Sequence, residues 1–169
     1  SRIYGDGVNI ARLIDDNEAT NWASLGSPVA GKQVTVDLAG GLQSVDRVQV
    51  SALLRPPIAV DPDPGSPTNP QGRVTALRQF QVLACVATGA VDCSDAGDFQ
   101  LVFTSAADAF PSVAPRPRAP ELTIRSFDIP RTDATHLRIQ VVTNQCTGAP
   151  DYAGEQDADP RANTDCATA

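Results

Sequence analysis

Short stretches in which apolar and polar residues alternate constrain this chain most, because a two-residue period is typical of a β-strand with one buried face. Val34, Val36 and Leu38, for example, alternate with polar residues. The strands expected from such patterns are residues 33–38, 47–54, 80–85, 99–103, 121–129 and 137–142. No window of a dozen residues carries a helical apolar stripe, so we expect only short helical turns, around residues 11–16. Six or more short strands predict an all-β fold, specifically a jelly-roll β-sandwich.

One predicted strand and two connections need separate comment. In residues 121–129, Ile124 and Phe127 fall on opposite faces, and a bulge between them would return both to the core. Residues 55–73 contain six prolines and residues 109–120 contain four. Such long proline-rich segments cannot form a buried ladder, so we expect both to be surface loops. The length of 169 residues predicts a single domain over residues 1–169.

Composition excludes two classes of partner. Twenty acidic residues against 13 basic ones leave a net charge of -7, whereas a protein that binds nucleic-acid phosphates needs a basic stripe. The same balance argues against a polybasic membrane-surface module. No apolar run approaches the roughly 20 residues of a transmembrane helix. We therefore expect no nucleic acid and no membrane span, and the sequence does not indicate the oligomeric state.

The four cysteines predict disulfides in an oxidising compartment. Four cysteines allow three connectivities. We favour Cys85 with Cys93 and Cys146 with Cys166, because each pair brackets a Gly/Asp-rich turn; buried free thiols are the alternative. The chain has no methionine and starts Ser-Arg-Ile-Tyr, without the charged and apolar regions of a signal peptide. We expect a mature fragment or excised domain of a secreted, extracellular protein.

No catalytic motif is present in the sequence. It lacks H-E-x-x-H, G-x-S-x-G, a P-loop and the dinucleotide-binding glycine pattern. His136 is the only histidine, and we expect it to be an exposed structural residue at the start of a strand. We predict a chain without catalytic residues of its own; the less favoured alternative is a small secreted hydrolase that uses His136 and a serine.

One short segment concentrates oxygen donors. Asp15, Asn17 and Thr20 lie within six residues, and calcium takes six to eight oxygen ligands. On the residues alone, an Asp-Asp-Asn stretch is more often a turn or a helix cap than a metal site.

The same segment carries a family resemblance. The pattern from Asp15 to Trp22, followed by strand residues 33–38, resembles the discoidin, or coagulation factor 5/8 type C, family. That family belongs to the galactose-binding-like superfamily of β-sandwiches, which includes family 32 carbohydrate-binding modules. Residues 45–50 look like the next strand of the family, and the specific resemblance covers about the first 50 residues.

The resemblance implies a structural calcium ion. Its ligands would be the main chain of Arg12 and the side chains of Asp15, Asn17 and Thr20, while Trp22 would be a core residue. Family members usually close with a strand whose glutamate completes the calcium shell, but this chain shows no such strand. Either Glu155 or another acidic residue substitutes, or the closing strand follows Ala169. Asn17 in place of an aspartate removes one charge and should weaken the site.

The tail carries a second, narrower resemblance. Residues 144–148, 152–157 and 163–166 look like the C-terminal extension of secreted fungalysin-type metallopeptidases, which carry a discoidin-like module after a zinc catalytic domain. That parentage implies that any peptidase activity belongs to a neighbouring domain, because this chain has no zinc motif.

Taken together, these features predict a non-catalytic accessory or binding module of an exported multidomain protein. In the superfamily, loops at one end of the sandwich bind the ligand; here these loops are residues 24–32, 55–73 and 87–98. A sugar site normally offers an aromatic platform, and these loops have almost no aromatic residues. This lack weakens the case for a sugar site. We still expect a glycan as partner, with docking onto a neighbouring catalytic domain as a comparable alternative.

Overall fold

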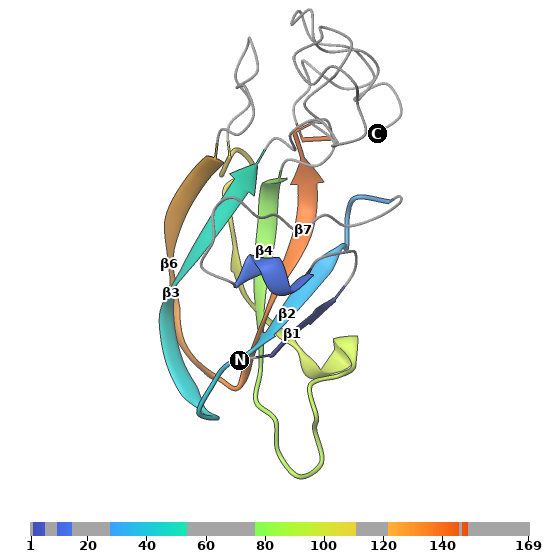
Figure 1. Cartoon of the computed structure of the whole chain (residues 1–169), viewed down its shortest axis with the longest axis vertical. Coiled ribbons are helices and arrows are strands. Elements are labelled where there is room, and N and C mark those ends of the chain that lie inside the picture. Colours follow the sequence, from blue (N-terminus) through green and yellow to red (C-terminus); the bar gives the residue numbers. More distant parts are fainter. Residues whose placement is uncertain are drawn as a thin grey trace, which may run out of the picture. The chain divides into compact units, whose positions relative to one another are not determined.

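The all-β prediction is confirmed by the computed structural model, which describes residues 2–5, 10–14, 28–53, 77–110, 122–145 and 147–148. The strands in this part of the chain are β1 (Arg2–Gly5), β2 (Gln33–Asp37), β3 (Gln43–Leu53), β4 (Leu77–Cys85), β5 (Gln100–Thr104), β6 (Leu122–Ala134) and β7 (His136–Asn144) (Figure 1). Two short 3-10 helices lie in the described residues, η1 (Ile10–Leu13) and η3 (Ala96–Asp98). The helical turn expected near residue 11 is therefore present. None of the described helices is long and apolar enough to cross a membrane.

The strands form two sheets. One sheet has five strands in the order β1-β2-β7-β4-β5, and the other pairs β3 with β6. β2 pairs antiparallel with both β1 and β7, so Thr35 lies opposite Tyr4 on one side and Arg138 on the other. These three side chains consequently share one face of the sheet.

Contacts divide the chain into two compact units. The first comprises Ser1–Val50, Phe80–Ser105 and Arg125–Val142, and the second Ser51–Gln79, Ala106–Ile124 and Thr143–Ala169. The candidate site described below lies entirely in the first unit.

Three aromatic rings join the two sheets within the first unit. The ring of Phe80 on β4 meets that of Phe127 on β6 edge-on, with centroids 4.8 Å apart. Phe103 on β5 lies 6.2 Å from Phe80 and 6.3 Å from Phe127. Among the described residues, the buried aliphatic side chains of the strands are Val34, Val82, Ala84, Ile129, Ala134 and Leu137. Phe80, Val82 and Ala84 are alternate residues, which confirms the period-two core face predicted for β4.

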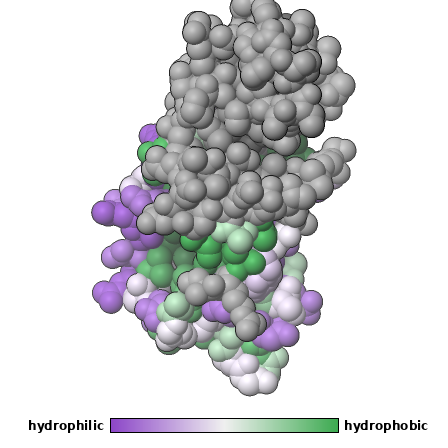
Figure 2. Space-filling model, viewed as in Figure 1, coloured by the Kyte–Doolittle hydropathy of each residue, from purple (hydrophilic) through white to green (hydrophobic). Residues whose placement is uncertain are grey.

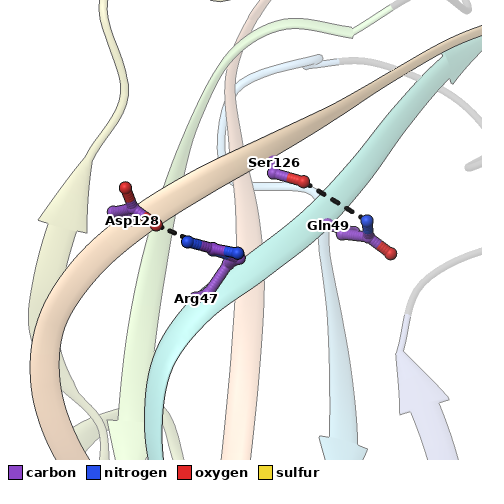
Figure 3. Close-up of polar contacts among 4 residues, drawn as sticks. All are labelled: Arg47, Gln49, Ser126 and Asp128. Carbon is purple, nitrogen blue, oxygen red and sulfur yellow. Dashed lines mark hydrogen bonds and ion pairs between the residues drawn. The ribbon is translucent and has the colours of Figure 1, made fainter.

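The outer face of the smaller sheet is polar, as its sequence pattern predicted. Arg47 donates through Nε to Asp128 at 2.8 Å, and the side-chain amide of Gln49 donates to the Ser126 hydroxyl at 3.2 Å (Figure 3). Figure 2 shows hydrophilic residues along the left side of the view, where Figure 1 places β3 and β6. Ile124 is 47% exposed, so the expectation that a bulge returns it to the core is wrong.

The second unit contains a buried amide that bridges two backbone segments. Gln145 donates through Nε2 to the carbonyl oxygens of Leu77, at 3.2 Å, and Phe110, at 2.8 Å. Phe110 is itself fully buried, and its N–H donates to the Arg78 carbonyl. These bonds replace the water that the buried carbonyls lose.

Candidate functional site at the disulfide turn

A disulfide shapes the turn between β4 and β5. Cys85 and Cys93 are bonded, with 5.9 Å between their Cα atoms, which confirms the first predicted pair. Both cysteines are buried with Phe99 in a small core under the turn. Cys146 and Cys166 lie outside the described residues, so the second pair remains a prediction. Of the three predicted ligand loops, residues 87–98 are the one the structure describes completely; they protrude at the lower end of Figure 1.

A single hydroxyl ties this turn to the start of β7. Thr135 Oγ1 accepts the N–H of Ala87 at 2.7 Å and donates to the Cys85 carbonyl oxygen at 3.2 Å. It also lies 2.8 Å from Nδ1 of His136. The turn is therefore held by hydrogen bonds as well as by its disulfide.

Tyr4 holds the turn at Cys93 through a hydrogen bond. Its hydroxyl donates to the Cys93 carbonyl oxygen at 3.1 Å, and Cys93 adopts a φ of 60°, a conformation that residues other than glycine seldom take. Burial raises the pKa of Tyr4 above its ordinary value; the charge of Arg138 lowers it, and the carboxylates of Asp37 and Asp92 raise it. Neither β1 nor the role of Tyr4 was expected from the sequence, because four residues are too few to show a clear alternation.

A buried arginine lies beneath the turn. The guanidinium of Arg138 covers the Phe99 ring, and its Nε donates to the Thr35 hydroxyl at 2.9 Å. Thr35 is 1% exposed, although the sequence pattern placed it on the solvent side of a half-buried strand. That expectation is wrong because Arg138, opposite Thr35 on β7, bonds to its hydroxyl and stacks on Phe99, the residue that follows the disulfide turn.

His136 is likewise half-buried, not exposed as expected. Its ring centroid lies 6.4 Å from that of Tyr4, and its Nδ1 bonds to Thr135. The hydroxyl beside it is already engaged by the Ala87 N–H and the Cys85 carbonyl. The Thr135 hydroxyl therefore acts in holding the turn, and the hydrolase alternative, which pairs His136 with a serine, stays a prediction.

An open hollow of about 380 Å³ lies against the inner side of the turn. Its lining comes from the end of β4, the turn, β5 and the end of β6: Ala84, Cys85, Val86, Val91, Gly97, Asp98, Gln100, Val102, Thr132 and Asp133. Aliphatic side chains form its apolar part, and carboxylates, an amide and a hydroxyl provide its polar part. The described lining contains no aromatic ring.

The polar groups of the hollow differ in how they are held. Asp98 accepts the N–H of Asp95 at 3.3 Å, which closes the short helical turn η3, and the Thr132 hydroxyl donates to the Pro130 carbonyl. Asp133 and Gln100 are exposed and project from strands. Carboxylate and amide groups on a fixed backbone can accept from and donate to the hydroxyls of a bound ligand.

Most of the predicted calcium ligands lie outside the described residues. The main chain of Arg12 lies in η1, while Asp15, Asn17, Thr20 and Glu155 lie outside the described residues, as does Trp22. Within the described part of the chain, no group of three or more His, Cys, Asp or Glu side chains could hold a metal ion. The calcium site therefore remains a prediction.

Comparison with known proteins gives distant structural neighbours. No protein-family model and no curated protein matches the sequence. One neighbour is a truncated AlyQ with CBM32 and alginate lyase domains, which is 17% identical with a TM-score of 0.49. The match covers 85% of this chain and 28% of the AlyQ chain.

Two isolated modules show a similar likeness. The CBM32 of AlyQ, in complex with 4,5-unsaturated mannuronic acid, is 18% identical with a TM-score of 0.49, covering 85% of this chain and 82% of that one. CpGH89CBM32-5 from Clostridium perfringens, in complex with GalNAc-beta-1,3-galactose, is 13% identical with a TM-score of 0.46, covering 85% and 83%. Family 32 modules belong to the galactose-binding-like superfamily that residues 15–38 resemble. At these identities and TM-scores, the similarity assigns neither a ligand nor a binding residue to this chain.

Proposed function

We propose that this chain is a non-catalytic carbohydrate-binding module of an exported multidomain protein. The observation that carries the proposal is the hollow beside the Cys85–Cys93 turn, whose lining includes both polar and aliphatic side chains. A small-molecule site typically combines apolar walls with a few placed polar groups. The family resemblance of residues 15–38 supports the same class of function.

The rigidity of the hollow supports binding. The disulfide, the Thr135 hydroxyl and the Tyr4 hydroxyl hold the turn that forms one wall. Binding to a wall that is already ordered avoids the entropic cost of fixing a loop. Gln100 and Asp133 extend from strands, whose backbone is also fixed, so their side chains can meet sugar hydroxyls in one geometry.

The test is a glycan array on the chain, followed by calorimetric titration with the best ligand. Gln100→Ala and Asp133→Ala should each weaken binding about tenfold, since each removes hydrogen bonds to the ligand. Gln49→Ala, on the outer face of β3, is the matched control and should bind normally. Complete silence on the array, or equal affinity in all variants, would contradict binding at the hollow.

Docking onto a neighbouring catalytic domain of a secreted metallopeptidase is the second candidate. The absence of an aromatic platform from the described lining favours it, because sugar sites usually supply one. A co-purification experiment with the adjoining domain of the parent protein tests it. Retention that survives excess glycan would support docking, and failure to associate would contradict it.

Calcium is proposed as a structural stabiliser of the module. The candidate ligands are the main chain of Arg12 with Asp15, Asn17, Thr20 and Glu155. This donor set consists only of oxygens, which is the chemistry that calcium prefers. The bound ion would stabilise the fold and take no part in a reaction.

A further inference from the structure

We infer that the proton of His136 regulates the order of the Cys85–Cys93 turn, so that the turn is held more tightly when the imidazole is charged than when it is neutral. The inference concerns the turn itself, and only its consequence for ligand affinity rests on the proposed function. It follows from the number of hydrogens and lone pairs that meet at the Thr135 hydroxyl.

The Thr135 hydroxyl has more partners than its single hydrogen can serve. The N–H of Ala87 donates to its Oγ1 at 2.7 Å. The Cys85 carbonyl oxygen, at 3.2 Å, and Nδ1 of His136, at 2.8 Å, also lie within hydrogen-bond distance of Oγ1. A hydroxyl offers one hydrogen and two lone pairs. All three bonds therefore exist together only while Nδ1 carries a hydrogen and donates it to the hydroxyl.

The charge of the imidazole sets which of these bonds form. An imidazolium carries a hydrogen on both ring nitrogens, so Nδ1 always donates to Thr135, and a charged donor forms the stronger bond. A neutral ring carries one hydrogen, and in the tautomer that places it on Nε2, Nδ1 accepts the hydroxyl hydrogen. The Cys85 carbonyl then loses that hydroxyl and retains the backbone N–H of Thr135, at 3.0 Å. Deprotonation thus removes one bond between the turn and the start of β7.

The affected bond lies in the wall of the hollow. Thr135 contacts Cys85 and Ala87, the two residues on either side of Val86, and both Cys85 and Val86 line the hollow. Loosening this segment adds the entropic cost of ordering it to the cost of binding a ligand. Deprotonation of His136 should therefore weaken binding as well as the turn.

His136 has ionisable neighbours on every element beside it. In the described part of the chain these neighbours are Tyr4 on β1, Asp37 on β2, Asp92 on the turn, Asp133 at the end of β6 and Arg138 on β7. Carboxylates and guanidinium groups ordinarily keep their charge between about pH 5 and 8, whereas an imidazole changes its charge there. Hydrogen bonds from Ser94 lower the pKa of Asp92, and burial raises the pKa of Tyr4. A change in the turn within this range is therefore assigned to His136.

The experiment is an NMR titration of the intact, isotope-labelled chain from about pH 5 to 8. His136 is the only histidine, so the single imidazole gives its charge and tautomer without ambiguity. Hydrogen exchange of the Ala87 amide, relative to the unfolded rate at each pH, reports opening of the turn. We expect Ala87 protection to fall about fivefold as pH rises, since one hydrogen bond is lost, with the same midpoint as the imidazole.

Three variants and one control amide isolate the cause. His136→Gln removes the titrating group and should abolish the pH dependence of Ala87 protection. Thr135→Ser keeps the hydroxyl and should preserve this dependence, whereas Thr135→Val should abolish it. The Gly31 amide, which donates to the Val141 carbonyl oxygen at 2.9 Å in another turn, should show constant protection.

Several outcomes would overturn the inference. These are constant Ala87 protection across the range, a midpoint that differs from that of the imidazole, and an unchanged pH dependence in His136→Gln. A neutral ring that keeps its hydrogen on Nδ1 would also overturn it, because deprotonation would then cost no bond. If His136→Gln does not fold, agreement or disagreement of the two midpoints in the parent decides the matter.

The consequence for binding is tested separately from the turn. A glycan found on the array should bind about fivefold more tightly at the acidic end of the range than at the alkaline end, and His136→Gln should remove this difference. Equal affinity at both ends would show that the turn does not regulate the hollow. A silent array would overturn the proposed function, while hydrogen exchange at Ala87 would still decide the inference about the turn.

Discussion

The guanidinium carbon of Arg138 lies 3.6 Å from the centroid of the Phe99 ring, and both side chains are buried, at 3% and 8% exposure. This stack connects β7 to the residue that precedes β5. Arg138 also donates to Thr35, so the buried cation has a ring and a hydroxyl as partners where it has lost water.

Phe99→Ala should destabilise the protein by about 3–5 kcal/mol, because it leaves a cavity and uncovers the guanidinium. Urea unfolding followed by circular dichroism measures the loss. Phe99→Leu keeps most of the volume and should cost clearly less. If both variants unfold at the same urea concentration as the parent, the stack contributes nothing.

Removal of the Cys85–Cys93 disulfide should lower the free energy of unfolding by about 2.5 kcal/mol. The unfolded chain regains the conformational entropy that the bond, which joins residues eight positions apart, had removed. The double variant Cys85→Ala, Cys93→Ala avoids placing new polar groups in the buried site. Its unfolding free energy should fall while its far-ultraviolet spectrum stays unchanged, since Thr135 and Tyr4 still hold the turn. A disordered turn in its NMR spectrum would show that the disulfide alone maintains it.

Alkaline pH should weaken the fold partly through Tyr4. The folded-state pKa of Tyr4 is raised above the reference value of 10.0, mainly by burial. Its contribution is therefore fully present below about pH 10 and is lost as pH rises through the folded-state pKa. Tyr4→Phe should lose about 1 kcal/mol at neutral pH, from the hydrogen bond to Cys93, and this difference should shrink at alkaline pH.

The test is to measure the unfolding free energies of the parent and of Tyr4→Phe across the alkaline pH range. Tyr152→Phe controls for the other tyrosine and should follow the parent. A difference between parent and Tyr4→Phe that stays constant with pH would contradict the assignment.

Calcium should raise the melting temperature. A specific site stabilises the folded state by about 2.7 kcal/mol when the free ion is at a hundredfold excess over its dissociation constant. Asp15→Ala should abolish the shift between calcium and chelator, and Asp46→Ala should retain it. If the parent protein has the same melting temperature in calcium and in chelator, the predicted calcium site is wrong.

The second disulfide should appear in a peptide map. Digestion without reductant should release the peptides of Cys146 and Cys166 joined together, and thiol titration of the denatured chain should find no free thiol. A free thiol at either position would contradict the predicted pairing.

Much of the fold could be predicted because alternation reports which face of a strand is buried. Phe80, Val82 and Ala84 lie in the core as their spacing indicates, and Arg47 and Gln49 lie outside. The pattern failed at Thr35 and Arg138, where Phe99, distant in sequence, stacks on the guanidinium on the face that alternation assigns to solvent. A local pattern carries no information about such a distant contact.

The candidate site was only partly predictable. The turn of residues 87–98 was anticipated as a ligand loop, and its Gly/Asp-rich composition gave the correct cysteine pair. Asp133 and Thr132 were not anticipated, because they come from the end of β6, which only the folded chain brings beside the turn. Gln100 was missed although it follows the turn closely in sequence, because nothing in the sequence distinguishes it from other polar strand residues. Tyr4 was missed for the same reason, since its partner lies 89 residues away.

The hydrogen bonds of the Thr135 hydroxyl allow residues that line the hollow to change during evolution without loss of the backbone course. Because this one atom contacts the end of β4, the turn and the start of β7, it holds the backbone beside the hollow through hydrogen bonds in which the side chains at positions 100 and 133 take no part. Homologous chains could exchange the residues at positions 100 and 133 and so acquire new specificities one substitution at a time. We expect changes at Thr135, by contrast, to be rare among such descendants.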